Sequence, residues 1–490
     1  MAGLIMLAVI AAPLPGAADV SVSNLREMDR TSALLAVAPR TNLPSEADDP
    51  ARPPQVRLLK PGVWTDDVGI DDYGNIYNQY RRSSVGTWSN YEEGRANPYP
   101  ALPDPLVLKN GRPVNDAAMW WQQRRPEILE EFYTEIYGRI PANMPGITWE
   151  VTGVTDNGVT RTKTIVGHID NSAYPQATPA INLTLTLPSN ATVPVPVLVA
   201  ISAFSGGGPR RGGPPPNVPA PAAESPRAAP VPPRAPAGPS PMQQVLARGW
   251  GYAVYNTASV QADNAGGLTQ GIIGLMNHGQ PRTRPDDWGA LTAWTWGLSR
   301  AIDYFETDHD VDPKRLGVEG HSRWGKTALW AAAQDPRWAV CYSSCSGEGG
   351  SKLSRRNFGE TTDNIAGSHW MALNFRKYAG HWGELPVDSH ELIALVAPRP
   401  LLVTGATQDP WSDPRGEFLA EVGAGPVYRL LGAKDLGATE MPAPDVALVS
   451  GELAFRKHVG AHTDVPDWPV FVEYAARYFT PAAGKGSGHE

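Results

Sequence analysis

The sequence predicts a three-layer α/β protein, in which helices cover both faces of a mostly parallel, twisted β-sheet. Segments with the period of strands alternate with segments with the period of helices over much of the 490 residues. Residues 193–201 form a nearly continuous apolar run, which is typical of a parallel strand buried on both faces. The hydrophobic content of 41% and the charged content of 19% are those of a folded chain.

The elements are expected in a fixed order along the chain. The first half is predicted to contain a helix at 116–137, strands at 148–154, 161–169, 180–187 and 193–201, a helix at 242–248, a strand at 252–255, a long loop region at 258–287 and a helix at 288–305. The second half is predicted to contain a strand ending at 316–318, a helix at 327–333, strands at 338–344, 399–404 and 427–431, and a last helix at 469–479.

The two ends of the chain differ from this pattern. Residues 1–18 contain an apolar run followed by small residues, which predicts a secretory signal peptide and a periplasmic or secreted protein. Residues 19–105 are expected to form an N-terminal arm and a covering segment, and residues 106–480 the main domain. Residues 481–490 are expected to be a C-terminal tail. Within the covering segment, the Asp- and Asn-rich stretch 71–78 lacks the glutamate that would close a calcium loop.

A proline-rich insertion interrupts the main domain at 206–241. Thirteen of its 36 residues are proline, so it cannot bury a core and is expected to be a disordered loop of polyproline character. It follows a predicted buried strand and therefore leaves the sheet at its carboxyl edge, where α/β proteins bind ligands. A neutral insertion is the simpler interpretation, and a lid or a partner-binding arm is the alternative.

The charge and the cysteine content exclude several classes of partner. The net charge of −8 argues against nucleic acid and anionic membranes as partners. The only two cysteines, Cys341 and Cys345, are four residues apart in a predicted strand, which separates their Cα atoms by roughly 13 Å. That distance is too long for a disulfide. Two cysteines are also too few for a set of cysteine metal ligands. We expect no metal and no cofactor, and we expect a monomer.

The stretch 315–330 is typical of a nucleophile elbow. Ser322 stands between a predicted strand and a predicted helix, and Gly320 and Gly325 bracket the turn. Such a turn lifts a serine hydroxyl clear of the sheet, and the N-terminus of the next helix points backbone N–H groups at the same place. Ser322 is therefore the candidate nucleophile, and the fold is predicted to be that of an α/β-hydrolase.

A serine needs a base, and in this fold the base follows the nucleophile and the acid in the chain. His462 is best placed, in a loop just before the last predicted helix. His458 is the rival, although it stands within a predicted strand or helix.

The acid is expected after the strand 399–404. Asp409 follows this strand by a few residues and is the natural candidate, whereas Asp413 is expected to cap the next helix. Glu348, in a glycine-rich turn after the preceding strand, is the alternative acid.

Two cations stand at the start of the elbow helix. The backbone N–H of Arg323 directly follows the serine, and its guanidinium could add positive charge where an oxyanion forms. Lys326 lies in the first turn of the helix, where anions are preferred. We expect Lys326 to face a ligand or a carboxylate, with solvent as the alternative.

Together these segments resemble the glucuronoyl esterases of carbohydrate esterase family 15, and they resemble the bacterial members in particular. The resemblance spans roughly residues 105–480. It is carried by Trp120–Gly138, Gly320–Lys326, Ser346–Gly350, Leu353–Glu360, Asp409–Pro414 and Gly460–His462.

The resemblance implies a serine carboxylic ester hydrolase of the 4-O-methyl-glucuronoyl methylesterase type that needs no metal. Its expected substrate is the ester that joins 4-O-methyl-glucuronic acid of glucuronoxylan to lignin alcohols. Ser322 is implied as nucleophile and His462 as base, with Arg323 supporting the oxyanion. Lys326 and Glu360 are implied to hydrogen-bond uronic-acid hydroxyls, and Trp411 to line the sugar pocket.

The chain departs from the family pattern at Cys345. Many members, the fungal ones especially, carry the catalytic acid at this position, and a thiol cannot orient a histidine as a carboxylate does. Some bacterial members carry an Asp after the later strand instead, which favours Asp409, with Glu348 as the fallback. Two other functions stay open at this point. The chain could be a carbohydrate acetyl esterase, or a carbohydrate-binding homologue whose catalytic residues have decayed.

Overall fold

The computed structural model describes residues 102–203, 238–379 and 381–479, and the short pieces 69–70, 76–77, 81–82, 88–91 and 93–96. The predicted signal peptide, the tail 481–490 and residues 206–237 of the proline-rich insertion lie outside the described residues. So does the stretch 71–78, except for Ile76 and Tyr77.

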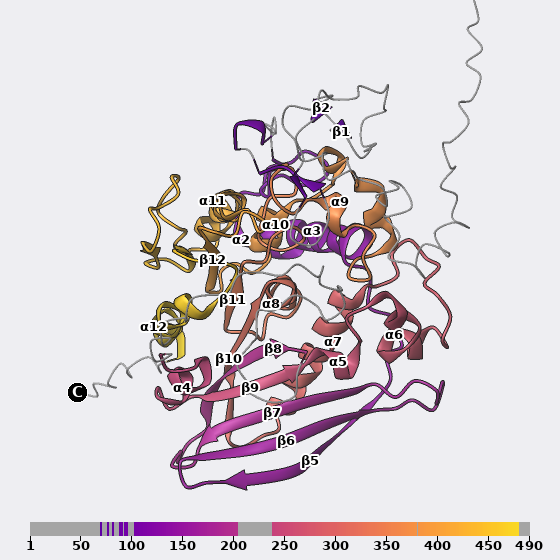
Figure 1. Cartoon of the computed structure of the whole chain (residues 1–490), viewed down its shortest axis with the longest axis vertical. Coiled ribbons are helices and arrows are strands. Elements are labelled where there is room, and N and C mark those ends of the chain that lie inside the picture. Colours follow the sequence, from indigo (N-terminus) through magenta and orange to yellow (C-terminus); the bar gives the residue numbers. More distant parts are fainter. Residues whose placement is uncertain are drawn as a thin grey trace, which may run out of the picture.

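A ten-stranded sheet forms the centre of the protein, in the order β13-β14-β12-β11-β10-β8-β9-β7-β6-β5 (Figure 1). The run from β14 to β9 is parallel throughout, whereas β13 at one edge and β7, β6 and β5 at the other pair antiparallel. The strands are β5 (Ile147–Asp156), β6 (Thr160–Ile169), β7 (Ala180–Pro188), β8 (Val195–Ser202), β9 (Gly251–Asn256), β10 (Val311–His321), β11 (Val340–Ser344), β12 (Leu401–Ala406), β13 (Ala447–Leu448) and β14 (Leu453–His458). The predicted three-layer α/β-hydrolase fold with a mostly parallel sheet is confirmed.

Helices bury both faces of the central strands, which explains their apolar runs, whereas the edge strand β5 is mostly exposed. In β8, Val197 and Val199 belong to the core on one face, and Leu198 between them belongs to the core on the other. One face is covered by α4 (Pro241–Leu246) and α12 (Trp468–Phe479). The other is covered by α7 (Ala290–Phe305), α8 (Arg323–Gln334), α10 (Ser389–Ala394) and α11 (Pro414–Leu430).

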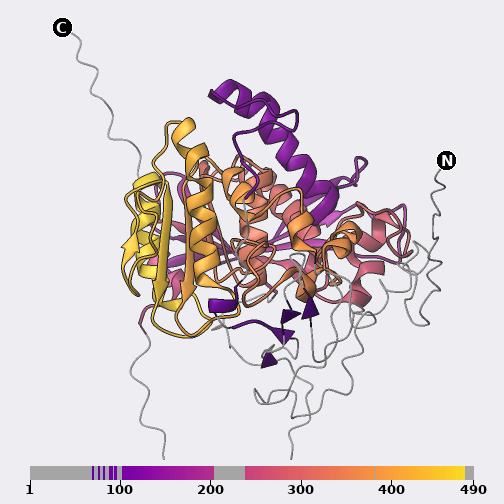
Figure 2. The ribbon, with the colours of Figure 1, turned by 90° about the horizontal axis from the view of Figure 1, so that it is seen from above.

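The helix predicted at 116–137 is present as one continuous helical segment with two wide π turns. It consists of α2 (Ala117–Met119), η4 (Trp120–Arg124), α3 (Arg125–Glu131) and η5 (Phe132–Ile136). Asp116 caps it by accepting a hydrogen bond from Met119 N. The segment, purple in Figure 2, packs outside α8 and α10, where Arg124 forms a buried ion pair with Glu391.

Two sequence predictions about the elements are wrong. Residues 427–431 are not a strand but the end of α11, because a short buried apolar run has the same pattern in a helix and in a strand. The strand in this part of the chain is β14. The region 258–287 is not only loop, since it contains α5 (Thr257–Val260), η6 (Ala265–Thr269) and α6 (Gly271–Met276).

The described pieces of the covering segment lie against the loop before α9. Gly359 N donates to Asn90 O at 2.8 Å, and Asn90 Nδ2 donates to Asn357 O at 2.9 Å. Glu93 forms ion pairs with Arg356 and Arg415. The remaining short elements are β1 (Gly69–Ile70), β2 (Ile76–Tyr77), β3 (Arg81–Arg82), β4 (Trp88–Ser89), η3 (Glu93–Arg95), α9 (Thr362–Ile365), η7 (Leu373–Tyr378), η8 (Trp382–Glu384) and η9 (Val465–Asp467).

In the part of the chain that the structure describes, no helix has both the length and the hydropathy to cross a bilayer.

Candidate active site

Four neighbouring parallel strands present four chemically distinct side chains at the carboxyl edge of the sheet. Ser322 follows β10, Cys345 follows β11, Asp409 follows β12 and His462 follows β14. This is the edge at which open α/β sheets bind their ligands.

Ser322 has a strained backbone at the turn between β10 and α8. Its φ of 60° and ψ of −128° are rare for a residue with a side chain, and such strain is common at functional sites. Its N–H donates to Ser344 O at 2.8 Å, and Lys326 N donates to its carbonyl at 3.1 Å. A Cβ on Gly320 would lie 2.0 Å from Trp324 O, so the turn requires glycine there.

His462 and Asp409 form a direct hydrogen bond, with 2.6 Å between Nδ1 and Oδ2. Ser412 Oγ donates to the same carboxylate oxygen at 2.6 Å. Burial alone would raise the pKa of the Asp409 carboxyl, but the hydrogen bond and charge of His462, helped by the hydrogen bond from Ser412, outweigh it and hold that pKa below its usual value. An ionised Asp409 makes Nδ1 the protonated nitrogen of His462 and leaves Nε2 to accept a proton. The His462 side chain is 38% exposed and Asp409 only 4%, so the pair opens toward solvent on the histidine side.

The rival histidine, His458, has both ring nitrogens engaged. It is fully buried, with Nδ1 at 2.8 Å from Asp467 Oδ2 and Nε2 at 3.2 Å from Ala461 O. Burial lowers the pKa of His458, but the hydrogen bond to Asp467 more than offsets this and raises it. A different histidine, His321, lies next to His462 with 4.3 Å between ring centroids. His321 is the last residue of β10, and sequence reasoning did not select it.

Cys345 is the residue at which the chain departs from the pattern that the sequence resemblance implies. Its φ of 45° is positive, and it is buried just beyond the end of β11. Burial, strengthened by the negative charges of Asp409 and Glu417, raises the pKa of the Cys345 thiol well above its usual value. Its sulfur nevertheless belongs to a group with Asp409 and His462, in which one ligand atom from each lies within 4.8 Å of the others.

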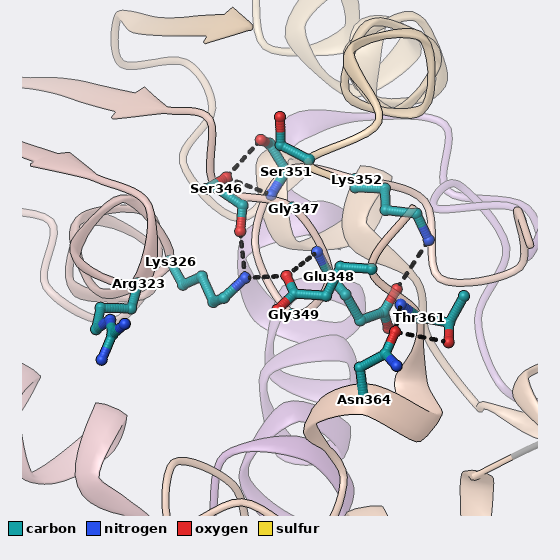
Figure 3. A network of polar contacts seen from close by, with 12 residues as sticks. Arg323, Lys326, Ser346, Gly347, Glu348, Gly349, Ser351, Lys352, Thr361 and Asn364 are labelled. Carbon is teal, nitrogen blue, oxygen red and sulfur yellow. Dashed lines mark hydrogen bonds and ion pairs between the residues drawn. The ribbon is translucent and has the colours of Figure 1, made fainter. Parts of the chain in front are cut away.

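Glu348, the alternative acid, is held inside the protein by other partners. Its Oε2 lies 3.1 Å from Lys352 Nζ (Figure 3). Its Oε1 accepts from Thr362 Oγ1 at 2.9 Å. Burial raises the pKa of the Glu348 carboxyl, although the charge of Lys352 opposes this. Both carboxylate oxygens of Glu348 are thus engaged away from His462, whose Nδ1 is already bonded to Asp409.

Arg323 is held beside the elbow by residues from two distant loops. Its Nη1 donates to Asp263 Oδ2 at 2.5 Å, and its guanidinium lies 5.1 Å from the ring centre of Trp370. The other oxygen of Asp263 lies 2.7 Å from both His369 Nε2 and Trp370 Nε1. Burial would raise the pKa of Asp263, but these partners lower it well below its usual value. Sequence reasoning missed these three residues, because their loops have neither periodicity nor a motif that marks them.

Lys326 faces a carboxylate, which is one of the two partners predicted for it from the sequence. Its ammonium donates to Glu360 Oε2 at 2.7 Å and to the carbonyl of Ser346, as Figure 3 shows. Glu348 N donates to the same Glu360 oxygen at 3.2 Å. Both members of the pair are buried, and the charge of Glu360 with the carbonyl of Ser346 offsets the cost of placing a cation in the first turn of α8. Gly347 has a φ of +59°, and a Cβ there would lie 2.7 Å from Glu360 Oε2.

Trp411 and Tyr91 flank this group. Trp411 is half-buried, and its carbonyl accepts from Glu360 N at 2.7 Å, so the loop after β12 and the loop before α9 are tied together. Burial raises the pKa of Tyr91 to about 12; a hydrogen bond to Ser89 opposes this, and the charges of Asp409 and Glu360 add to it. Tyr91 comes from the covering segment, which therefore reaches the site.

A strained serine between strand and helix, with a histidine–aspartate pair on strands further along the same edge, defines the arrangement of an α/β-hydrolase. Comparisons with known proteins narrow this class. The model of the family described as glucuronyl esterase, fungi, matches residues 242–432. Carbohydrate esterase MZ0003, from an unknown prokaryotic organism, is 36% identical over 455 residues, which cover 87% of this chain and 98% of that protein.

Two solved structures are also similar. A CE15 glucuronoyl esterase from Teredinibacter turnerae T7901 is 37% identical with a TM-score of 0.71, over 82% of this chain and 96% of its own. The glucuronoyl esterase from Solibacter usitatus is 39% identical with a TM-score of 0.67, over 79% of this chain and all of its own. The chain belongs to the glucuronoyl esterases, carbohydrate esterase family 15, and is a carboxylic ester hydrolase. The family resemblance predicted from the sequence motifs is confirmed.

Proposed function

We propose that the protein hydrolyses esters of (4-O-methyl-)glucuronic acid through a Ser322–His462–Asp409 triad and an acyl-enzyme. The observation that carries the proposal is the 2.6 Å hydrogen bond between His462 and Asp409 at the edge where Ser322 follows β10. This bond supplies what a weak serine nucleophile needs, namely a base held in one tautomer by a buried acid.

The reaction proceeds in two halves. Ser322 Oγ attacks the uronate carbonyl while His462 Nε2 takes its proton, and Asp409 stabilises the imidazolium that forms. The tetrahedral intermediate collapses, His462 passes the proton to the leaving alcohol, and the glucuronoyl group stays on Ser322. Water, deprotonated by His462, then attacks this ester, and Ser322 recovers its proton as the uronic acid leaves.

Arg323 is the proposed support for the oxyanion. Its backbone N–H follows the nucleophile, and its guanidinium is fixed by Asp263 and by the face of Trp370. Donors that are held in place before the reaction stabilise developing charge without reorganising, which is where most of the rate gain of such sites arises.

Lys326, Glu360 and Trp411 are the proposed sugar contacts. A buried cation and carboxylate beside the elbow offer a donor and an acceptor to sugar hydroxyls, and a half-buried indole offers an apolar face. An acetyl group has no hydroxyls for this pair to bind, which favours a uronate ester over a carbohydrate acetyl ester. For the natural substrate we propose the ester between glucuronoxylan and lignin alcohols. It would be cleaved by a monomer outside the cytoplasm, in line with the leader predicted at 1–18.

Hydrolysis of benzyl glucuronate and of acetylated xylan tests the substrate. We expect turnover of the benzyl ester and little or none of the acetylated polymer, and the reverse result would make the protein an acetyl esterase. A serine-directed phosphonate should label the wild type but not Ser322→Ala. A wild type that is neither labelled nor active would be a decayed, carbohydrate-binding homologue.

A pair of isosteric substitutions tests the acid. Asp409→Asn keeps the shape but favours the wrong tautomer of His462, and should lower kcat on benzyl glucuronate by about 10³–10⁴-fold. Glu348→Gln should retain kcat within about tenfold once folding is verified, because its carboxylate contacts Lys352 and Thr362. A much larger loss of kcat in Glu348→Gln than in Asp409→Asn would show that Glu348 is the catalytic acid.

A further inference from the structure

Three adjacent strands bring a thiol, a carboxylate and an imidazole to one place. In the order β14-β12-β11, the strands are followed by His462, Asp409 and Cys345. One ligand atom from each of these residues lies within 4.8 Å of the others. The proposed reaction uses the carboxylate and the imidazole, but it gives the thiol no role.

We propose that Cys345, Asp409 and His462 form a binding site for a thiophilic divalent ion, with Zn²⁺ as the best fit, and that the bound ion inhibits the esterase. Thiolate, imidazole and carboxylate are the side chains that bind zinc in proteins, at about 2.0–2.3 Å. Three protein ligands leave one position of a tetrahedral ion for water. The exposed side of His462 opens this position to solvent.

The geometry requires only a small rearrangement. In a tetrahedral site the ligand atoms lie roughly 3.3–3.7 Å apart, as the zinc–ligand bond lengths dictate. The widest separation in the cluster is at most 4.8 Å, so it must contract by no more than about 1 Å. The 2.6 Å contact between His462 and Asp409 must open by a similar amount. His462 can move to do both, because it is on a loop and its side chain is partly exposed.

Charge balance favours the ion. Asp409 carries one negative charge, and Cys345 adds a second when its proton is released to solvent on binding, so a divalent ion with neutral His462 leaves no net charge in this buried place. Mg²⁺ prefers oxygen ligands and keeps most of its water, so it should not compete for this site.

Inhibition follows from the same contacts. A metal between Asp409 and His462 replaces the hydrogen bond that orients the base, so the ion and a working triad exclude each other. This consequence rests on the proposed function. Metal binding itself does not, and it can be measured without any substrate.

Co²⁺ binding to the full chain is the direct test, because a Co²⁺–thiolate bond gives a charge-transfer absorption. The band should appear in the wild type and in Cys341→Ser, the matched control that removes the other buried cysteine. It should be absent in Cys345→Ser and Cys345→Ala, and weakened in His462→Ala. Excess Zn²⁺ should abolish the wild-type band by displacing Co²⁺.

Inhibition of benzyl glucuronate hydrolysis by Zn²⁺ is the second test. Cys345→Ser should keep its basal activity and require at least about tenfold more Zn²⁺ for half-inhibition, since one of three protein ligands is lost. A chelator should restore the wild type, and Mg²⁺ should have no effect. The proposal is overturned if the wild type shows no Co²⁺ band, if the band persists in both Cys345 variants, or if Zn²⁺ inhibits wild type and Cys345→Ser equally. A wild type inactive on glucuronate esters that still shows the Cys345-dependent band would refute the proposed function and leave the metal site standing.

Discussion

Asp263 and Arg323 form an ion pair of 2.5 Å that links the loop after α5 to the residue following the proposed nucleophile. The two residues are 60 positions apart in the sequence. The Arg323 side chain is 42% exposed, so without Asp263 and the face of Trp370 little would restrict the guanidinium to one position. Asp263 therefore holds in place the guanidinium that we propose to support the oxyanion.

Replacing Asp263 by Asn should lower kcat on benzyl glucuronate by about tenfold, a fraction of the 10²–10³-fold effect of losing an oxyanion donor. KM and the melting temperature should change little, because the pair is partly exposed. In the Arg323→Ala background, Asp263→Asn should lower kcat no further. A similar loss on both backgrounds, or a fall in stability that parallels the fall in kcat, would show that Asp263 does not act through Arg323.

The buried pair of Lys326 and Glu360 predicts a stability effect that depends on which partner is removed. Glu360→Gln keeps an acceptor oxygen but removes the negative charge beside the buried ammonium of Lys326, and should lower the free energy of unfolding by up to about 3–5 kcal/mol. Lys326→Met leaves the carboxylate unpaired and should cost a similar amount. The double variant, which combines Lys326→Met with Glu360→Gln, should be more stable than either single variant, because no unpaired charge remains. Chemical denaturation of the wild type, the two single variants and the double variant gives the coupling energy between Lys326 and Glu360.

The same variants separate stability from substrate binding. The double variant should regain stability but keep a raised KM for benzyl glucuronate, since both proposed sugar contacts are gone. Its activity on 4-nitrophenyl acetate, which has no sugar, should stay near that of the wild type. An unchanged KM for benzyl glucuronate would make the pair a purely structural one.

Much of the site could be predicted because it follows the parallel strands. Ser322 comes directly after a predicted strand and Asp409 a few residues after another, and parallel strands end at one edge. His462 was predicted from its loop before the last helix, because the strand that it follows, β14, was not predicted. The chain order of nucleophile, acid and base completed the prediction. For Ser322 and Asp409, the strand that precedes each residue predicted its place in the fold, and the length of the loop was not needed.

The parts that were missed depend on contacts without a sequence pattern. Asp263, His369 and Trp370 come from loops that meet only through tertiary structure. The strand expected at 427–431 is helix because the packing of α11, and not its short apolar run, decides its conformation. Cys345 was recognised as a departure from the family, but its proximity to Asp409 and His462 required the folded strands.

Gly320 predicts a steric effect at the elbow. A Cβ at this position would lie 2.0 Å from Trp324 O and 2.2 Å from Trp324 C, and the backbone cannot give way as a flexible side chain can. Gly320→Ala should therefore cost about 1–3 kcal/mol of unfolding free energy and remove most activity by displacing Ser322. Gly153→Ala in β5 is the control, because the added Cβ meets nothing within 4 Å there. It should change neither the free energy of unfolding nor the activity. An active, equally stable Gly320→Ala protein would contradict the tight turn.

Glu421 predicts that stability falls as the pH rises. Its carboxyl in α11 is fully buried, and neither oxygen has a hydrogen-bond partner among the residues that the structure describes. Burial, and then the negative charge of Glu417, raise the pKa of Glu421 well above its usual value. A raised pKa means that the folded chain keeps a proton that the unfolded chain loses above about pH 4.3. The stabilisation from this retained proton is fully present below that pH. As the pH rises, the free energy of unfolding falls by about 1.4 kcal/mol per pH unit until the pKa of the folded state is passed.

Glu421→Met removes this titration and should raise the free energy of unfolding more at pH 8 than at pH 5, measured by chemical denaturation at both values. Because Glu417 is its neighbour, the difference belongs to the pair of carboxyls and not to Glu421 alone. Glu440→Met at an exposed position is the matched control, and it should leave the pH dependence unchanged. If wild type and Glu421→Met lose stability in parallel between pH 5 and pH 8, the buried carboxyl does not titrate in this range, and the loss of stability has another origin.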